Sequence, residues 1–507
     1  MKKNRILLFI KKYWYFLFLV FPFISFCMIN KQPDKDIWFI LNNGRYVLAH
    51  GIPNIDPFSI HKGLHYIMQQ WLFSIIIYLF YKKLGKYGIL IFMFIFYFLL
   101  TFVYYKLCYL ISNDKKKTIF IITIFLTLSH VYLVSRPQIV TYIILLLETY
   151  FLELYIKRNN RRFLYPLPLL SLLLINVHCS MWFLQFVFIL PFLLNGINVK
   201  ELTIKKINIK PILIIMIIMF IVGLINPYGI EAITFIFNSY GIKEINENIV
   251  EMNPASINFY YWYYCLLAIF LLIVFLNYNK KEKLDIRYIL FIIGTFLLAS
   301  LHTKCIAYFF IWFGYAISNI KTNIVISNKY ILRLLKTSLI TSVVFLTIII
   351  FPTINLLVKN YEIKNVDLDP IVKYLNSNYE KKDIVLYTEF SEGGYMEFNG
   401  FKCYLDPRAE VFVAKFNKKE DIFKESVKLY KYGFDLKKFV KKYKFTHILV
   451  KIDNGLYEYL EQDNDYILEK KQYFDKDKKL SLYKLFVRKD ISVKYKKQQR
   501  ETKNNEK

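Results

Sequence analysis

Apolar runs of roughly 20 residues recur along this chain from Tyr13 to Pro352, with short clusters of Lys and Arg between them. A helix needs about that many apolar residues to cross the hydrocarbon core of a bilayer. The pattern is therefore typical of a polytopic α-helical membrane protein. Composition agrees, because 56% of the 507 residues are hydrophobic and 19% are aromatic, more than a soluble domain of this length would carry.

The net charge of +30 would suit a nucleic-acid partner, but its distribution argues against one. Much of the excess Lys and Arg in the first two thirds lies between apolar runs, where it sets topology and meets anionic lipid. The six Cys are scattered singly and no C-x-x-C pair occurs, so we expect buried, reduced Cys and no zinc site or disulfide framework. The sequence therefore predicts a membrane partner and no nucleic acid.

The positive charges predict a topology, because cytoplasmic loops carry the excess of Lys and Arg. The cluster from Lys2 to Lys12 places the N-terminus in the cytoplasm, and we expect 13–30 to be an uncleaved signal anchor. If 71–84 also crossed the membrane, the basic cluster at 113–117 would lie outside, so 71–84 is predicted to lie along the outer interface. About 11 spans then place the C-terminal region outside, and those after the first fall at 87–111, 118–134, 138–156, 163–177, 181–197, 211–226, 259–277, 286–301, 305–320 and 335–356.

This topology gathers the unusual polar segments between spans on the outer side. Ionisable groups at membrane depth are costly and usually functional, so the segments are interpreted as the lining of one outward-facing cavity. The alternative is that polar residues simply end helices. The segments are "PDKD" at 33–36, "DPFS" at 56–59, "SRPQ" at 135–138, "NVHCS" at 176–180, "NPYG" at 226–229 and "HTK" at 302–304.

Two regions are predicted to lie outside the lipid. The first loop, 31–86, is predicted to hold a helix interrupted at Gly44, a turn at 56–59 and the interfacial helix. Residues 357–489 are predicted to form an extracytoplasmic α/β domain, because short strand-like runs alternate with helical patterns. The transmembrane domain is then 1–356, and the basic tail at 490–507 is expected to be disordered. Strands are expected at 383–388, 402–406, 446–451 and 481–486, and "EGGYMEFNG" is expected to form a turn.

The candidate chemistry is a set of carboxylates and a set of cations. Asp34, Asp36 and Asp56 follow the first span, and a carboxylate there can act as a general base or hold a divalent cation. Arg136, His178 and Lys304 are candidates to bind a phosphate. The alternative for Arg136 is snorkelling to the lipid headgroups, and the alternative for His178 is packing. Such groups suit a lipid-linked phosphate substrate.

Ordered motifs resemble a group of bacterial polytopic proteins related to GT-C glycosyltransferases. The run D-x-W-x-x-L-x-x-G-R-x-x-L-x-x-G-x-P-x-x-D-P-F-S spans Asp36 to Ser59. The likeness continues in order with Gly63, "QWL" at 70–72, "RPQ" at 136–138, Asn176, His178, "NPYG" at 226–229, "GGY" at 393–395 and "LDPRAEVF" at 405–412. The resemblance implies an outer first loop with interfacial helices, a catalytic Asp after the first span and a polyprenyl-phosphate-sugar donor.

Within that resemblance, Asp36 matches the Asp after the first span and Asp56 the Asp of the D-P-F-S turn. The chain departs from the group's pattern at Ile40, at Gln69-Gln70 and at Lys304. Gln cannot act as a base and is a poor metal ligand. Whether the protein uses a divalent cation as cofactor therefore stays open.

The sequence thus predicts a GT-C-like membrane glycosyltransferase in the bacterial cytoplasmic membrane. It would transfer a sugar from a polyprenyl-phosphate donor to an envelope glycan, lipid or protein, with Asp36 as base helped by Asp34 or Asp56. Arg136, His178 and Lys304 would hold the donor phosphate. The alternative is a non-enzymatic lipid or glycan transporter or an envelope-assembly scaffold on the same fold.

Overall fold

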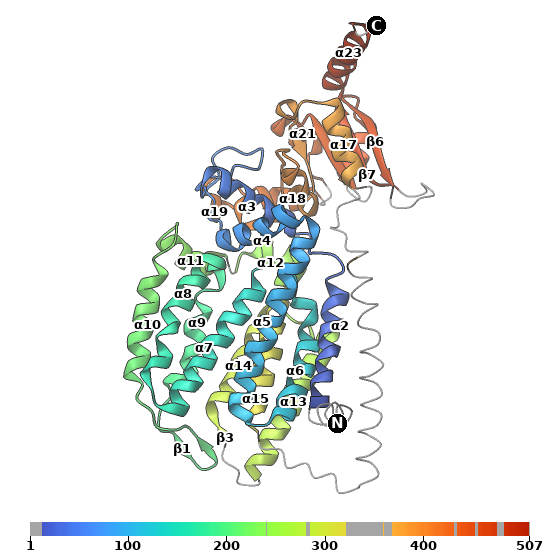
Figure 1. Ribbon diagram of the computed structural model, residues 1–507. Coiled ribbons are helices and arrows are strands. Elements are labelled where there is room, and N and C mark those ends of the chain that lie inside the picture. Colours follow the sequence, from blue (N-terminus) through green and yellow to red (C-terminus); the bar gives the residue numbers. More distant parts are fainter. Residues whose placement is uncertain are drawn as a thin grey trace, which may run out of the picture. The chain divides into compact units, whose positions relative to one another are not determined.

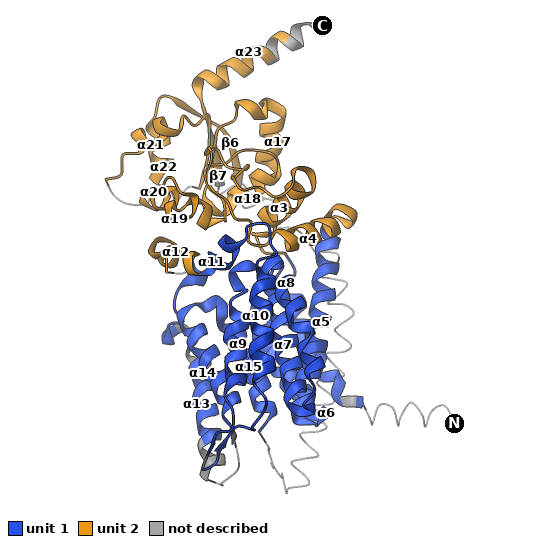
Figure 2. Ribbon diagram, turned by 90° about the vertical axis from the view of Figure 1, so that its left-hand side faces the viewer, with its two compact units in different colours: residues 1–32, 86–236, 249–361 blue, residues 33–85, 237–248, 362–507 orange. Residues whose placement is uncertain are grey.

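The computed structural model describes residues 13–239, 241–279, 284–320, 358, 368–429, 433–451, 455–473 and 481–505 (Figure 1). The chain divides into two compact units, which are described separately (Figure 2). Unit 1 is residues 1–32, 86–236 and 249–361, and unit 2 is residues 33–85, 237–248 and 362–507. This division differs from the predicted one, because the first loop groups with the C-terminal region and not with the apolar helices.

Unit 1 is a bundle of apolar helices. Every predicted span within the described residues overlaps a helix, and the span predicted at 335–356 lies outside them. The helices are α2 (Val20–Ile29) after the 3-10 turn η1 (Trp14–Leu19), α5 (Lys86–Ser112), α6 (Lys115–Ser129), α7 (Gln138–Arg158), α8 (Pro166–Val177), α9 (Leu184–Leu193), α10 (Lys210–Gly223), α13 (Ile257–Asn279), α14 (Ile286–Leu301) and α15 (Ile306–Ser318).

Two of the described helices, α5 and α7, are long and apolar enough by themselves to cross a membrane, and the other apolar helices are shorter. One stripe of α5 exposes large apolar side chains at Ile91, Ile95, Phe98 and Phe102. Their spacing of three and four residues keeps them on one helix face. A continuous apolar face left open is typical of contact with lipid. The exact number of crossings stays a prediction.

Loops that the charge rule assigns to the cytoplasm contact one another in unit 1. The strand β2 (Leu202–Thr203) pairs in parallel with β3 (Leu284–Asp285), which joins the loop after α9 to the loop before α14. The hydroxyl of Tyr155, near the end of α7, donates to the Asn208 carbonyl at 2.6 Å. Three segments predicted to share one side of the membrane therefore lie together. Which side this is stays a prediction.

Unit 2 combines two helices of the first loop with a small mixed sheet. The first-loop helices α3 (Ile37–His50) and α4 (Trp71–Leu84) pack against each other. The sheet has the order β4-β5-β7-β6, in which β4 and β5 are parallel and the other pairs antiparallel. The remaining elements are α12 (Lys243–Asn248), α17 (Asp369–Asn378), β4 (Leu386–Tyr387), α18 (Phe390–Phe398), α20 (Ile422–Lys428), α21 (Leu436–Tyr443), β5 (His447–Lys451), α22 (Gly455–Gln462), β6 (Tyr466–Tyr473), β7 (Ser481–Arg488) and α23 (Lys489–Asn505).

The helix α4 is the segment for which an interfacial position was predicted. Its 14 residues reach about 21 Å at 1.5 Å per residue, well short of the ~30 Å hydrocarbon core. It ends at Gly85, which has a φ of 57° and separates it from α5. Because glycine adopts that left-handed conformation without strain, α4 and α5 are two helices and not one long span.

Two parts of unit 2 differ from the prediction. Residues 402–406 form no strand of their own, and Cys403 makes only isolated bridges to Ser59 and Leu386. The tail predicted to be disordered is the helix α23. Its residues are mostly strong helix formers, and its first turns are anchored because Ser492 donates to Glu469 at 2.5 Å and Tyr495 to Asp383 at 2.9 Å.

The segment "EGGYMEFNG" is also not a turn, because its first part lies in α18. A Cβ on Gly393 would lie 1.9 Å from the Leu405 carbonyl oxygen, and one on Gly394 would lie 3.5 Å from the Cβ of Phe39. Gly393 therefore lets α18 approach the chain around Asp406 closely. A Cβ on Gly394 would make only an ordinary van der Waals contact with α3.

Gly44 does not interrupt α3 but allows it to cross α4 closely. A Cβ at this position would lie 2.1 Å from the Ser74 carbonyl oxygen, which is a backbone atom that cannot turn aside. We therefore expect Gly44→Ala to destabilise the helix pair by about 1–3 kcal/mol, as overpacking does. Faster hydrogen exchange in α3 and α4 would report this loss.

The matched control is Gly294→Ala in α14, where a new Cβ meets nothing within 4 Å. Relative to glycine, alanine favours a helix by about 0.8–1 kcal/mol, so exchange in α14 should slow or stay unchanged. Equal effects of the two substitutions on their own helices would contradict the close crossing of α3 and α4.

Candidate functional site

Arg136, the first predicted phosphate ligand, lies in unit 1 just before α7. Its Nη1 forms an ion pair with Oε2 of Glu251 at 2.6 Å, and Glu251 belongs to the short turn η5 (Val250–Met252). A guanidinium carries five N–H donors, so a pair through Nη1 does not by itself exhaust its capacity. No local pattern points to this partner, because Glu251 lies in an irregular segment between helices.

The "HTK" segment lies beside this ion pair. The hydroxyl of Thr303 donates to the backbone carbonyl of Glu251 at 3.2 Å, and Nδ1 of His302 lies 2.8 Å from another carbonyl of the same segment. Lys304 follows directly in the turn that these contacts hold. The structure therefore places Lys304 next to the segment that pairs with Arg136.

His178, the third predicted phosphate ligand, is buried where α8 ends. Its Nδ1 lies 2.8 Å from the hydroxyl of Thr141, which is in the first turn of α7. The charge of Lys304 acts electrostatically on the His178 ring. Contacts through Glu251 and Thr141 thus link the segments that carry Arg136, His178 and Lys304.

The carboxylates nearest the first span, Asp34 and Asp36, are partly exposed and lie at the start of α3 in unit 2. The Asp34 carboxylate accepts the backbone N–H of Asp36 at 2.9 Å, and the Asp36 carbonyl accepts the N–H of Ile40 at 3.2 Å. Asp36 is the N-cap residue of α3. The first turn of the helix thereby fixes the backbone of Asp36.

Asp56, the third predicted carboxylate, has a different environment. It accepts the backbone N–H of Ser59 at 2.9 Å, which closes the predicted turn. Its Oδ1 also accepts from Nη1 of Arg408 at 2.7 Å, and neither side chain is more than 2% exposed. Arg408 is the arginine of the "LDPRAEVF" motif. The turn of the first loop is therefore ion-paired to a motif 352 residues later.

Arg408 is the centre of a buried ion cluster with three carboxylates. Its Nη2 lies 2.5 Å from Asp406 and 3.5 Å from Glu397, in addition to the contact with Asp56. The guanidinium also lies over the rings of Phe58 and Tyr66, each at 4.9 Å. We call Asp56, Glu397, Asp406 and Arg408 the Arg408 cluster. It joins the first loop to the C-terminal region within unit 2.

Burial and neighbouring charges together determine which carboxylates of the Arg408 cluster are ionised. Burial alone would raise the pKa of Asp56, but the Arg408 charge and the hydrogen bonds from Ser59 and Arg408 together hold that pKa below its ordinary value. Burial and the neighbouring Asp406 raise the pKa of Glu397 well above its ordinary value, against the attraction of Arg408. Asp56 is therefore a stably ionised partner of an arginine, whereas a general base must take up a proton.

Gln69 is one of the positions at which the chain departs from the group's pattern. Its Nε2 donates to the Glu410 carboxylate at 3.1 Å. Among the residues that the structure describes, no three His, Cys, Asp or Glu side chains are placed to hold one metal ion. Asp34 and Asp36 supply only a pair of carboxylates. The described residues therefore do not fit a divalent-cation site, and no step below uses one.

Comparison with known proteins gives a likeness in fold. No family model and no curated protein sequence matches this chain. Among solved structures, the chain resembles the apo oligosaccharyltransferase of the archaeon Archaeoglobus fulgidus, with 11% identity and a TM-score of 0.57. The match covers 87% of this chain and 70% of that one.

The same archaeal enzyme, AglB, also matches in two other forms, each with 10% identity over 88% of this chain and 70% of that chain. One is tethered by a disulfide bond to an acceptor peptide containing the NVT sequon, at a TM-score of 0.55. The other is in complex with an inhibitory peptide and a dolichol-phosphate, at a TM-score of 0.54. The fold of this chain is thus related to that of a GT-C glycosyltransferase.

Proposed function

We propose that this chain is a membrane glycosyltransferase of GT-C type. It would transfer a sugar from a polyprenyl-phosphate donor to an envelope glycan, lipid or protein at the outer face of the bacterial cytoplasmic membrane. The observation that supports the proposal is that Glu251 contacts both Arg136 and the turn of Lys304, while His178 contacts Thr141 five residues after Arg136. Two cations and an imidazole in that position suit the phosphate of a lipid-linked donor.

The likeness in fold supports the same class of donor. The archaeal oligosaccharyltransferase that this chain resembles binds a dolichol-phosphate in one structure, which is a lipid-linked phosphate. Such a donor keeps its apolar tail in the bilayer, and the exposed apolar stripe of α5 supports a contact of unit 1 with lipid.

The roles are assigned residue by residue. Arg136, His178 and Lys304 would hold the donor phosphate and stabilise the charge that develops on the leaving group. Asp36 would accept the proton of the acceptor hydroxyl, since it is partly exposed and its backbone is fixed by the first turn of α3. Asp34, which holds the Asp36 backbone, would position it. Asp56 would support the reaction only by holding the first loop through Arg408.

The deciding experiment replaces Asp36 with Asn in a strain that lacks the chromosomal copy. General-base catalysis contributes typically 10²–10⁴-fold to a rate, so Asp36→Asn should lower product formation by about that factor. Envelope glycans and lipid-linked sugars in isolated membranes would be quantified by mass spectrometry. The Asp36 side chain makes no capping hydrogen bond to α3, so the helix should remain folded.

A matched control is Asp421→Asn, because Asp421 is also the N-cap residue of a helix in unit 2 and accepts the N–H of Lys424 at 3.1 Å. It should leave product formation unchanged. An unaltered product profile for well-expressed Asp36→Asn would refute the enzymatic proposal. Accumulation of a lipid-linked sugar on the cytoplasmic leaflet of the deletion strain would instead favour the transporter.

A further inference from the structure

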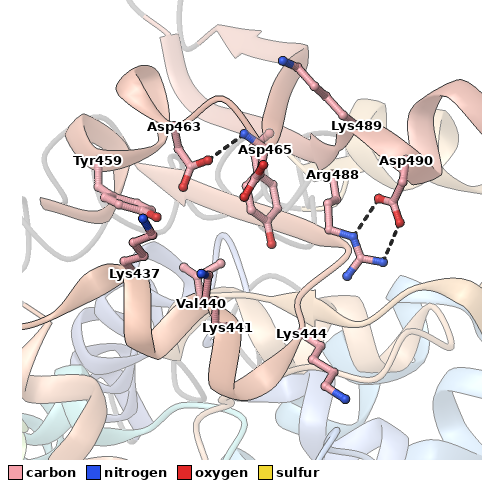
Figure 3. A pocket seen from close by; sticks show the side chains of 11 residues that line it. Lys437, Val440, Lys441, Lys444, Tyr459, Asp463, Asp465, Arg488, Lys489 and Asp490 are labelled. Atoms are coloured by element: carbon pink, nitrogen blue, oxygen red, sulfur yellow. Dashed lines mark hydrogen bonds and ion pairs between the residues drawn. The ribbon is translucent and has the colours of Figure 1, made fainter.

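Unit 2 contains a cavity of about 450 Å³ that is separate from the Arg408 cluster (Figure 3). Its walls come from α21, from α22 and the start of β6, and from the junction of β7 with α23. The volume lies in the range of small-molecule sites, about 300–1,000 Å³. The predicted site residues do not line it, so it needs an explanation of its own.

The cavity carries cations that no acidic side chain of the described residues neutralises. Lys437 and Lys441 line it from one face of α21 at a spacing of four residues, and Lys444 lines it from the position directly after the helix. Lysines so spaced repel one another. By contrast, Lys442 on the same helix pairs with Glu425 at 3.1 Å and lies outside the cavity.

The opposite wall supplies hydrogen-bond acceptors and an aromatic side chain. Asp463 accepts the backbone N–H of Asp465 at 2.7 Å, and Tyr459 lines the same wall. Figure 3 shows Arg488 and Asp490 joined to each other in the same cavity, through contacts of 2.7 and 2.9 Å. Because that arginine is neutralised within the cavity, its positive character comes from the lysines.

We propose that this cavity binds a segment of an anionic glycan, a proposal that rests on the proposed function because it names the class of acceptor. The lysines of α21 contact carboxylate or phosphate groups of the glycan. Asp463 and Asp465 accept hydrogen bonds from its hydroxyls, and Tyr459 offers part of an apolar ring to a sugar face.

The acidic groups of the cavity favour a glycan over other anions. A nucleic acid or an anionic bilayer presents a continuous row of phosphates, which Asp463, Asp465 and Asp490 would repel. A glycan carries its charges at intervals and offers hydroxyl donors between them. A wall of lysines that faces a wall with carboxylates matches that chemistry.

The test measures binding with the full-length protein in detergent, without any transfer reaction. Fluorescently labelled polygalacturonate oligomers probe carboxylate recognition, phosphorylated mannan probes phosphate recognition, and dextran is the uncharged reference. The protein should bind at least one charged glycan and not dextran, with affinity falling as salt increases. The triple variant Lys437→Gln, Lys441→Gln and Lys444→Gln should weaken that binding by about tenfold or more.

The matched control changes three exposed lysines of unit 2 that do not line the cavity, as Lys373→Gln, Lys402→Gln and Lys415→Gln. It removes the same charge and should alter binding less than about twofold. Equal losses in the two triple variants, or stronger binding to RNA or to phosphatidylglycerol vesicles than to either charged glycan, would overturn the proposal. Asp36→Asn should bind normally, so a failed transferase assay with intact glycan binding would remove the proposed reaction and keep this site.

Discussion

Arg408→Met should destabilise unit 2 by about 3–5 kcal/mol, the usual loss when one partner of a buried ion pair is removed. Methionine fills much of the space but leaves Asp56 and Asp406 buried without their cation. A loss of this size corresponds to hydrogen exchange that is about 10²–10³-fold faster or more in unit 2. Exchange in the helices of unit 1, measured in the same sample, provides the internal reference.

Arg488→Met is the matched control, because Arg488 also pairs with an aspartate two residues away. That pair is exposed, at 32% for Arg488 and 62% for Asp490, so its loss should change stability by no more than about 1 kcal/mol. Adding Asp56→Asn and Asp406→Asn to Arg408→Met should recover part of the protection, because no unpaired charge then remains on those residues. Indistinguishable exchange in Arg408→Met and Arg488→Met would show that the Arg408 cluster does not hold unit 2 together.

Mild acid should destabilise unit 2 through His447, which is fully buried in β5 with Nδ1 2.9 Å from the Thr446 hydroxyl. The pKa of His447 is lowered to about 4, mainly by burial, with Glu469 opposing the change and Arg488 adding to it. Between pH ~6.5 and ~4 the unfolded chain therefore binds a proton that the folded chain does not. Stability should be full above pH ~6.5 and fall by about 3 kcal/mol as the pH approaches 4.

His447→Asn should remove this acid sensitivity, because Asn can keep a hydrogen bond to Thr446 and does not titrate. The measurement is the protection factor of β5 across this pH range, corrected for the intrinsic exchange rate. Glu397, whose pKa is raised, contributes with the opposite sign in both proteins, so the difference between them isolates His447. His50→Asn removes an exposed imidazole of the same unit and should leave the profile unchanged. Parallel profiles for wild type and His447→Asn would contradict this assignment.

The helices of unit 1 could be predicted because each apolar run carries its own signal. The positions of basic residues predicted that several loops share one side of the membrane, and two of those loops contact each other through the pairing of β2 with β3. The strand β6 was missed because "YILEKKQY" is rich in charge. It lies at the edge of the sheet, where Lys and Glu are tolerated and protect against unwanted pairing.

The candidate residues were harder to place than the helices. The sequence singled out Arg136, His178 and Lys304 by their unusual position, but it offered no way to see Glu251 or Thr141 as their partners. For Asp56 it suggested a base beside Asp36, because nothing local reveals a partner 352 residues away. The signal that could have been used is Arg408, a charged residue between apolar residues in "YLDPRAEVF", which had to find carboxylates if it was buried.

The contact between Asp56 and Arg408 has a consequence for how the chain is made. Ribosomes add about 5–20 residues per second, so Arg408 emerges on the order of tens of seconds after Asp56. Throughout that interval the first loop has already been synthesised, but Arg408, the partner of Asp56, has not. The first loop is therefore among the last parts of the protein to complete its fold. It must remain unaggregated until the C-terminal region has been translated.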